Sequence, residues 1–271
     1  MKRWVAVAVA VMLASAALRA DVTVTQSVTM AGGPAAMAAG APMPRVVTQI
    51  KGMKMRIESG VAGNTTVTLV DLATKQILML NAADKTARAL DSASTPVPKD
   101  TPVPEMESSF KATGQSKTID AVACDEYAIS MTMDMANMAG RGGQMPPEAA
   151  EMMKDMKMVM TGSSWLAKSG AGIAEFLTFQ KGAVEAGLGG AMLGAMGGAG
   201  NGLDKILKAS ATANGMPYLT EMTITIEGAG PMADMMKQMG SMTVTNKVTA
   251  ISTDALSDDL FKVPADYKLV K

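Results

Sequence analysis

The chain has 271 residues, in which 25 lysines and arginines balance 25 aspartates and glutamates, and it contains no histidine. The charge balance leaves no basic field that could hold phosphates, so we expect no nucleic-acid partner. The lack of histidine excludes Ser-His and Cys-His nucleophile pairs, an ordinary proton shuttle near neutral pH and a zinc site built on imidazole. Carboxylate pairs could still catalyse, but none stands in a recognisable catalytic setting, and we expect neither an enzyme nor a cofactor.

The first 20 residues have the pattern of a secretory signal peptide. Two basic residues precede an apolar run over residues 4–13, which is followed by small residues. The run is too short to span a bilayer comfortably, so a cleaved leader is preferred to a membrane anchor. Cleavage could follow Ala17 or Ala20, and no cysteine lies nearby for lipid attachment. We therefore expect export across the inner membrane to the periplasm, without a stable membrane anchor.

Alternating apolar and polar residues predict a series of antiparallel strands over the first third of the chain. The stretch that begins at Val22 places valines on one face and hydroxyls on the other, which is typical of a half-buried strand. The same alternation recurs over residues 53–58, 66–70 and 76–80, with turn-forming residues such as Gly60 and Asp84 between them. This region predicts a β-rich fold.

A proline-rich stretch interrupts the strands at residues 91–105. Its four prolines predict an extended surface connection, because proline cannot donate a hydrogen bond to a β-ladder. A domain linker is the alternative, but strand-like alternation resumes unchanged over residues 110–135. We therefore expect a long loop within one domain that extends from residue 21 to residue 271.

The methionine-rich segment at residues 136–155 is predicted to contain a helix that starts at Pro146 and Pro147. Beyond residue 155 the methionine spacing fits a helical face at intervals of four or a strand face at intervals of two. Because Val159, Thr161 and Trp165 favour β structure, the sequence predicts a strand over residues 156–166.

The second half is predicted to contain helices over residues 172–186 and 203–211, joined by a glycine-rich segment at residues 187–202. Glycines at four-residue spacing in this segment are also found in packed membrane helices. Glycine disfavours a helix by about 1 kcal/mol relative to alanine, so a mobile loop or flap is preferred. Alternation resumes over residues 222–226 and 242–248 and predicts two further strands.

The single cysteine, Cys124, cannot form an internal disulfide. Its neighbours Asp125 and Glu126 disfavour a thiolate. We expect a buried structural thiol.

The order of these segments resembles a known family of exported proteins. The strand sequences GMKMRIE and TLVDLATKQILMLNAADKTA are followed by GQSKTIDAVACDEYAI, SSWLAKS and the C-terminal VTAISTDALSDDLFKVPADYKLVK. Together they resemble, over residues 22–271, an uncharacterised bacterial family related to the periplasmic lipoprotein carriers and lipoprotein-localisation factors. The resemblance implies a β-rich α+β fold in which a strongly curved antiparallel sheet forms an incomplete, half-open barrel. A few helices would pack in or over its concave face and leave an apolar cavity for acyl chains.

The methionine-rich and glycine-rich middle departs from the better-known carriers, so lipoprotein handling itself is not carried over. Methionine offers a flexible and polarisable lining for irregular apolar shapes, and aromatic residues make up only 3% of the chain. We predict a non-catalytic protein that binds or carries a lipid or acylated chain, with residues 145–155 and 187–202 as flaps. The predicted lining residues are Met53, Met55, Met79, Met131, Met133, Met222 and Met242.

Two other interpretations remain open. Thioethers are soft ligands suited to Cu(I), and Met131, Met133, Met135 and Met138 could form such a site in an exported protein. Convergence of these four sulfurs on one centre would favour this interpretation. Alternatively, the methionines fill an ordinary core and the protein has a structural role in the cell envelope without a small ligand.

Overall fold

The computed structural model describes residues 21–33, 45–61, 64–90, 107–135, 153, 155–189 and 201–270. The predicted leader, the proline-rich loop, Met138 and most of the two predicted flaps lie outside the described residues. The described strands form one sheet with the order β12-β6-β5-β4-β3-β2-β1-β11-β10-β9-β8-β7. The strands are β1 (Val22–Gly32), β2 (Arg45–Lys51), β3 (Lys54–Val61), β4 (Asn64–Asp71), β5 (Gln76–Asn81), β6 (Thr86–Leu90), β7 (Glu107–Ile119), β8 (Val122–Asp134), β9 (Lys157–Ala167), β10 (Met216–Glu227), β11 (Met242–Ser252) and β12 (Lys268–Val270).

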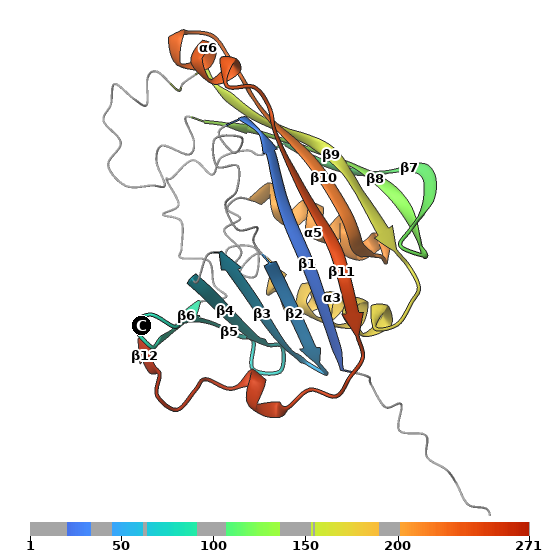
Figure 1. Cartoon of the computed structure of the whole chain (residues 1–271), viewed down its shortest axis with the longest axis vertical. Helices are drawn as coiled ribbons and strands as arrows, with labels where there is room; N and C mark the ends of the chain where they lie inside the picture. Colours follow the sequence, from blue (N-terminus) through green and yellow to red (C-terminus); the bar gives the residue numbers. More distant parts are fainter. Residues whose placement is uncertain are drawn as a thin grey trace, which may run out of the picture.

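The predicted fold class is confirmed: the protein is β-rich, and its curved sheet is not closed. Neighbouring strands are antiparallel except for the short β12, which pairs in parallel with β6. Figure 1 shows two wings that differ in direction because the sheet twists and curves. We call β2–β6 with β12 the N-terminal wing and β7–β11 the C-terminal wing, and β1 joins them by pairing with β2 and β11.

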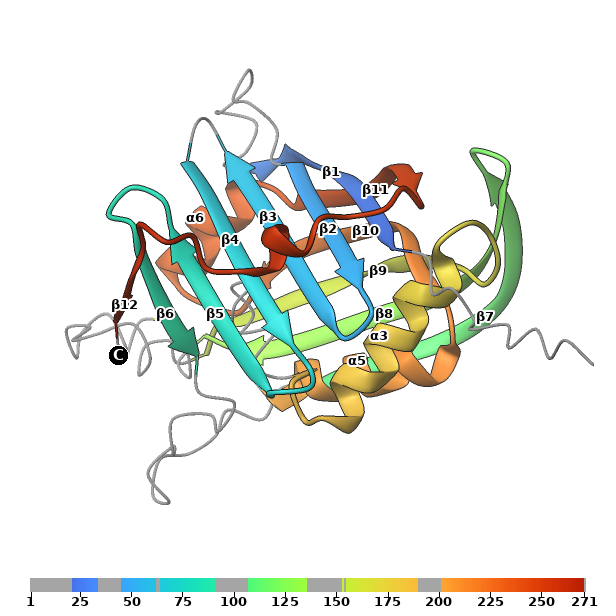
Figure 2. The ribbon, with the colours of Figure 1, turned by 90° about the horizontal axis from the view of Figure 1, so that it is seen from below.

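Two helices, α3 (Ile173–Glu185) and α5 (Asn201–Ala213), lie against one face of the sheet, which we call the inner face. They lie side by side in Figures 1 and 2. Both helices were predicted from the sequence, and their positions confirm the expected helices over a concave sheet. A third helix, α6 (Pro231–Gln238), was not predicted and lies at the far tip of the C-terminal wing (Figure 1).

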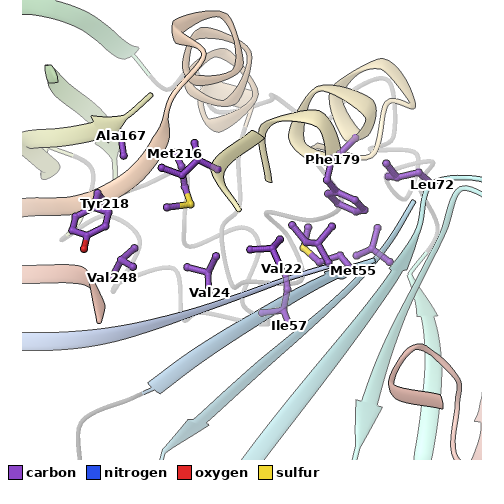
Figure 3. Packing of buried hydrophobic residues seen from close by; sticks show 14 of the residues in the cluster. Val22, Val24, Met55, Ile57, Leu72, Ala167, Phe179, Met216, Tyr218 and Val248 are labelled. Atoms are coloured by element: carbon purple, nitrogen blue, oxygen red, sulfur yellow. The ribbon is translucent and has the colours of Figure 1, made fainter. Parts of the chain in front are cut away.

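The main core lies between α3 and the strands around β1. Ile173 and Phe179 of α3 are almost fully buried against a cluster that includes Val22 and Ile50, which oppose each other across β1 and β2. Figure 3 shows the Phe179 ring pointing from α3 towards the strand that carries Met55. Burying each such side chain stabilises the fold by roughly 1.5 to 3 kcal/mol.

Met53 does not lie on the inner face, contrary to the prediction. β3 begins at Lys54, which pairs with Lys51, so Gly52 and Met53 form a two-residue hairpin turn. Gly52 has a φ of 58°, a conformation that glycine adopts readily. The turn places Met53 outside the strand alternation, and its side chain is 50% exposed.

The C-terminal segment covers the opposite, outer face of the N-terminal wing. After β11 it passes through the 3-10 helix η2 (Asp258–Phe261) and ends in β12. Figure 2 shows it crossing the strands on the side away from α3. Val263 and Tyr267 pack against an outer-face cluster of strands β4, β5 and β6. The buried members of this cluster are Val67, Leu69, Leu80 and Ala87.

Two lysines fix the C-terminal segment to the sheet. Lys51 donates a hydrogen bond to the Leu256 carbonyl oxygen at 2.6 Å and forms an ion pair with Asp258 at 2.8 Å. Lys85 pairs with Asp266 at 2.8 Å. The hydrogen bonds to these lysines lower the pKa of both aspartates, and the same bonds raise the pKa of both lysines. The pairs are exposed, so they position the segment more than they stabilise the fold.

Candidate functional site

The inner face of the C-terminal wing carries an apolar surface that we call the methionine face. Met131 lies opposite Met160, and Met133 lies opposite Met158, across β8 and β9. Alternation along each strand keeps these side chains on the face that α5 covers. The pairing continues across β10 and β11. The methionine face consists of Met131, Met133, Met158, Met160, Met222, Ile224, Ile226, Met242 and Val244.

Helix α5 covers only the edge of the methionine face that lies near β7. Ile206 of α5 packs with Phe110, Ile129 and Met131, and Met131 is only 6% exposed. The other eight members of the face are half-buried. The methionine face is therefore neither a closed core nor an ordinary polar surface, and contiguous apolar surface of this kind often marks an interaction site.

The structure brings four of the seven predicted lining residues together on the methionine face: Met131, Met133, Met222 and Met242. The other three lie apart from them. Met55 is buried in the main core beneath α3, Met79 is half-buried on the N-terminal wing opposite Thr68, and Met53 is in the exposed turn.

Met158 and Met160 belong to the methionine face but were not among the predicted lining residues. The prediction placed them in a strand without assigning them to the site. Their signal was present in the two-residue methionine spacing over residues 156–160. What the sequence lacked was the pairing of β9 with β8, which sets Met158 and Met160 opposite Met133 and Met131.

A row of polar side chains crosses the inner face between the methionine face and the main core. The hydroxyl oxygens of Ser164 and Thr220 lie 3.0 Å apart, and Asn246 is the next residue in register across β11. The Oδ1 atom of Asn246 is shielded from solvent and accepts no hydrogen bond from the described part of the chain. A buried acceptor without a donor costs roughly 1 to 3 kcal/mol, so this oxygen favours a ligand or water that donates to it.

A second group of methionines, the tip cluster, lies beneath α6. Met135, Met156 and Ala233 are its buried centre, and the Met135 N–H donates a hydrogen bond to the Met156 carbonyl oxygen at 2.8 Å. The half-buried members of the tip cluster are Met153, Met158, Ile226, Met232 and Met236.

The residues of the predicted soft-metal site are distributed over two clusters. Met131 and Met133 pack in the cluster near α5, whereas Met135 belongs to the tip cluster. Four residues of strand separate the Met131 and Met135 backbones by about 13 Å. Met138 lies outside the described residues. The structure therefore groups Met135 with sulfurs that the sequence pattern did not associate with it.

The titratable groups form no hard-metal centre in the described ranges. No group of three or more aspartates, glutamates or cysteines in the described ranges could hold a metal ion. Cys124 is 2% exposed, which confirms the predicted buried thiol. Burial, followed by the charge of Asp125, raises the pKa of this thiol and disfavours the reactive thiolate.

Comparisons with family models and with curated proteins add no relative. No family model matches the chain, and no curated protein is significantly similar to it. No helix in the described part of the chain is both long enough and apolar enough to cross a membrane. The resemblance to the lipoprotein carriers stays a prediction from the sequence.

Proposed function

We propose that this protein is exported to the periplasm and binds or carries an apolar ligand, a lipid or an acylated chain, on the methionine face without catalysing a reaction. The observation that carries the proposal is the half-burial of eight apolar side chains in continuous register on the inner face of an open sheet. A filled core would bury these side chains, whereas a contiguous apolar surface of this kind often marks an interaction site.

The composition of the methionine face suits an acyl chain. Methionine side chains are unbranched and polarisable, so they adapt to a ligand of irregular shape. Each methylene that moves from water to such a surface contributes about 0.8 kcal/mol. A chain of ordinary fatty-acid length would therefore gain enough free energy to bind without any polar contact.

The row of polar side chains formed by Ser164, Thr220 and Asn246 would orient the ligand on the methionine face. Asn246 lies two residues along β11 from Val244, so its unpaired Oδ1 borders the methionine face. A hydroxyl or amide N–H at the head of an acylated ligand could donate to this oxygen. The acyl chain would then extend over Met222 and Met160 towards the tip.

Export and the family resemblance support the same proposal. The leader pattern at residues 1–20 directs the chain to a compartment where lipids and acylated proteins pass between membranes. The resemblance to lipoprotein carriers implies a curved open sheet, and the sheet of this protein is curved and open.

The first test is native mass spectrometry of the protein prepared from the periplasm without detergent. An adduct of several hundred daltons that leaves under mild activation would support the proposal, and its mass would give the class of ligand. A bare chain that also fails to bind added fatty acid would favour the structural role without a small ligand.

The second test places the ligand on the methionine face by comparing adjacent residues. Met160 and Val159 are both half-buried on β9 but point to opposite faces. We expect Met160→Gln to weaken binding of a fluorescent fatty acid about tenfold, which corresponds to 1.4 kcal/mol. Val159→Gln should leave the affinity unchanged. Equal effects of the two substitutions would contradict binding on the inner face.

A further inference from the structure

The tip cluster gathers thioethers from segments that are distant in the sequence. Met135 follows β8, Met156 precedes β9, and Met232 and Met236 come from α6. Met232 and Met236 are four residues apart, so both project from the same side of the helix. Ala233 between them is fully buried, which lets the helix approach the strands closely.

We propose that the tip cluster binds a soft monovalent metal ion, Cu(I), through the sulfurs of Met135, Met156, Met232 and Met236. This site differs from the one predicted from the sequence, because only Met135 is common to both. It is also distinct from the site of the acyl ligand proposed above, since none of its four residues belongs to the methionine face.

The chemistry of the donors selects the ion. Thioethers are neutral, soft ligands that suit Cu(I), whereas Zn²⁺ and other harder ions require thiolate, imidazole or carboxylate donors. In the described part of the chain, no group of three or more aspartates, glutamates or cysteines could hold a harder ion. A monovalent ion also brings only one positive charge into a largely apolar site, which limits the cost of removing it from water.

The position of α6 suits a site that an ion can enter. The helix is only eight residues long and lies at the end of the sheet, away from α3 and α5 (Figure 1). Lys237 holds it by a hydrogen bond to the Gly228 carbonyl oxygen at 2.6 Å, and the lysine is half-exposed. Only this short helix therefore separates the buried sulfurs from solvent on that side.

Packing alone and metal binding predict different results for the same substitution. Methionine and leucine have similar apolar volume, so Met→Leu usually costs less than about 1.5 kcal/mol in a core. Leucine has no sulfur and cannot bind Cu(I). Two neighbouring methionines serve as a control, because Met235 and Met239 are 54% and 40% exposed and do not belong to the tip cluster.

The experiment titrates the purified protein with Cu(I) under anaerobic conditions against a chromogenic Cu(I) chelator. We expect one ion per chain and a copper-edge X-ray absorption spectrum with sulfur neighbours alone, at about 2.3 Å as in other metal–sulfur sites. Met232→Leu combined with Met236→Leu should weaken the affinity at least tenfold. Met235→Leu combined with Met239→Leu should not change it, and neither should Cys124→Ala.

The proposal would be overturned by no competition with the chelator, by nitrogen or oxygen neighbours in the spectrum, or by equal affinity in both double variants. Loss of binding in Met131→Leu combined with Met133→Leu, with the tip variants unaffected, would place the ion elsewhere and also overturn it. The fatty-acid titration of the same variants separates this proposal from the carrier function, because Met232→Leu with Met236→Leu should bind fatty acid normally.

Discussion

Gly162 of β9 lies directly opposite Met222 of β10, and the two strands approach so closely that no β-carbon fits on the glycine. An added methyl group would overlap the Glu221 carbonyl oxygen and lie 2.8 Å from the Met222 Cα atom. Because these obstacles are backbone atoms, a rotamer change cannot relieve the overlap. Gly162 thus keeps β9 and β10 in register at the centre of the methionine face.

We expect Gly162→Ala to lower the free energy of unfolding by about 1 to 3 kcal/mol, as overpacking does elsewhere. Chemical denaturation monitored by circular dichroism measures this change. Gly182→Ala in α3 is the control: its added methyl group meets only the flexible end of the Leu72 side chain, at 3.0 Å. Alanine favours a helix over glycine by about 1 kcal/mol, so that variant should be at least as stable as the native protein. Similar losses in both variants would contradict the backbone overlap.

The C-terminal segment should be held less firmly on the sheet in acid. The hydrogen bonds from Lys51 and Lys85 lower the pKa of Asp258 and Asp266 in the folded protein. A carboxyl group with a lowered folded pKa stabilises the fold above its unfolded pKa, near 3.9, and this contribution is lost as the pH falls through the folded value. The raised pKa values of the two lysines change the stability of the fold only above about pH 10.4, where lysines in the unfolded chain lose their protons.

Hydrogen exchange, corrected for its intrinsic pH dependence, measures this release. Between pH 6 and pH 3 we expect the protection of residues 256–270 to fall more than that of β3 and β4. Lys85→Met should already expose the end of the segment at pH 6. Uniform loss of protection along the whole chain would instead indicate global unfolding.

Tyr267 should contribute much more to stability than Leu269, although both residues belong to the same short segment. Tyr267 packs on the outer-face cluster, whereas Leu269 is 72% exposed. We expect Tyr267→Ala to cost roughly 2 kcal/mol of unfolding free energy, less than a full core truncation because the ring is only half-buried. Leu269→Ala should change it by less than about 0.5 kcal/mol. If the two variants had equal stability, the segment would not be docked on the sheet.

The strands and the helices were predictable wherever a local pattern marks them. Alternation identified β1, β3–β5, β10, β11 and the region of β7 and β8, and β9 followed from Val159, Thr161 and Trp165 despite the methionine spacing. Helix α6 was missed because PMADMMKQ is short and lies between two glycine-containing connections. The face of Met53 was wrong because a hairpin turn resets the alternation, and the sequence does not reveal which residue begins the strand.

The candidate site was predictable only in part, because it depends on which strands pair. Spacing along one strand shows that Met131, Met133 and Met135 share a face. It cannot show that β9 and β10 complete that face or that α6 joins Met135 to Met156. The unpaired oxygen of Asn246 has no sequence signal at all, because it arises from burial between distant strands.

Cys124 should resist thiol reagents in the folded protein. Its side chain is almost fully buried, and burial raises the pKa of the thiol, so the reactive thiolate is scarce near neutral pH. We expect a colourless native sample after addition of an aromatic disulfide reagent and release of one equivalent of chromophore in guanidinium. Rapid reaction of the native protein would contradict this burial. The experiment also gives an opening rate for the region around the start of β8.

Replacement of Asn246 should separate stability from ligand binding. Leucine has a similar size and removes the buried acceptor that lacks a donor, so Asn246→Leu should raise the free energy of unfolding by about 1 kcal/mol. Thr220→Val is the contrasting variant, since it removes the partner of the Ser164 hydroxyl at 3.0 Å and should cost about 0.5 to 1.5 kcal/mol. Thermal denaturation without ligand measures both changes.

If Asn246 orients the head of an acylated ligand, the more stable Asn246→Leu variant should bind a fatty-acid amide more weakly but a plain hydrocarbon equally well. A variant that is less stable than the native protein would show that the Asn246 side chain has a donor in solution.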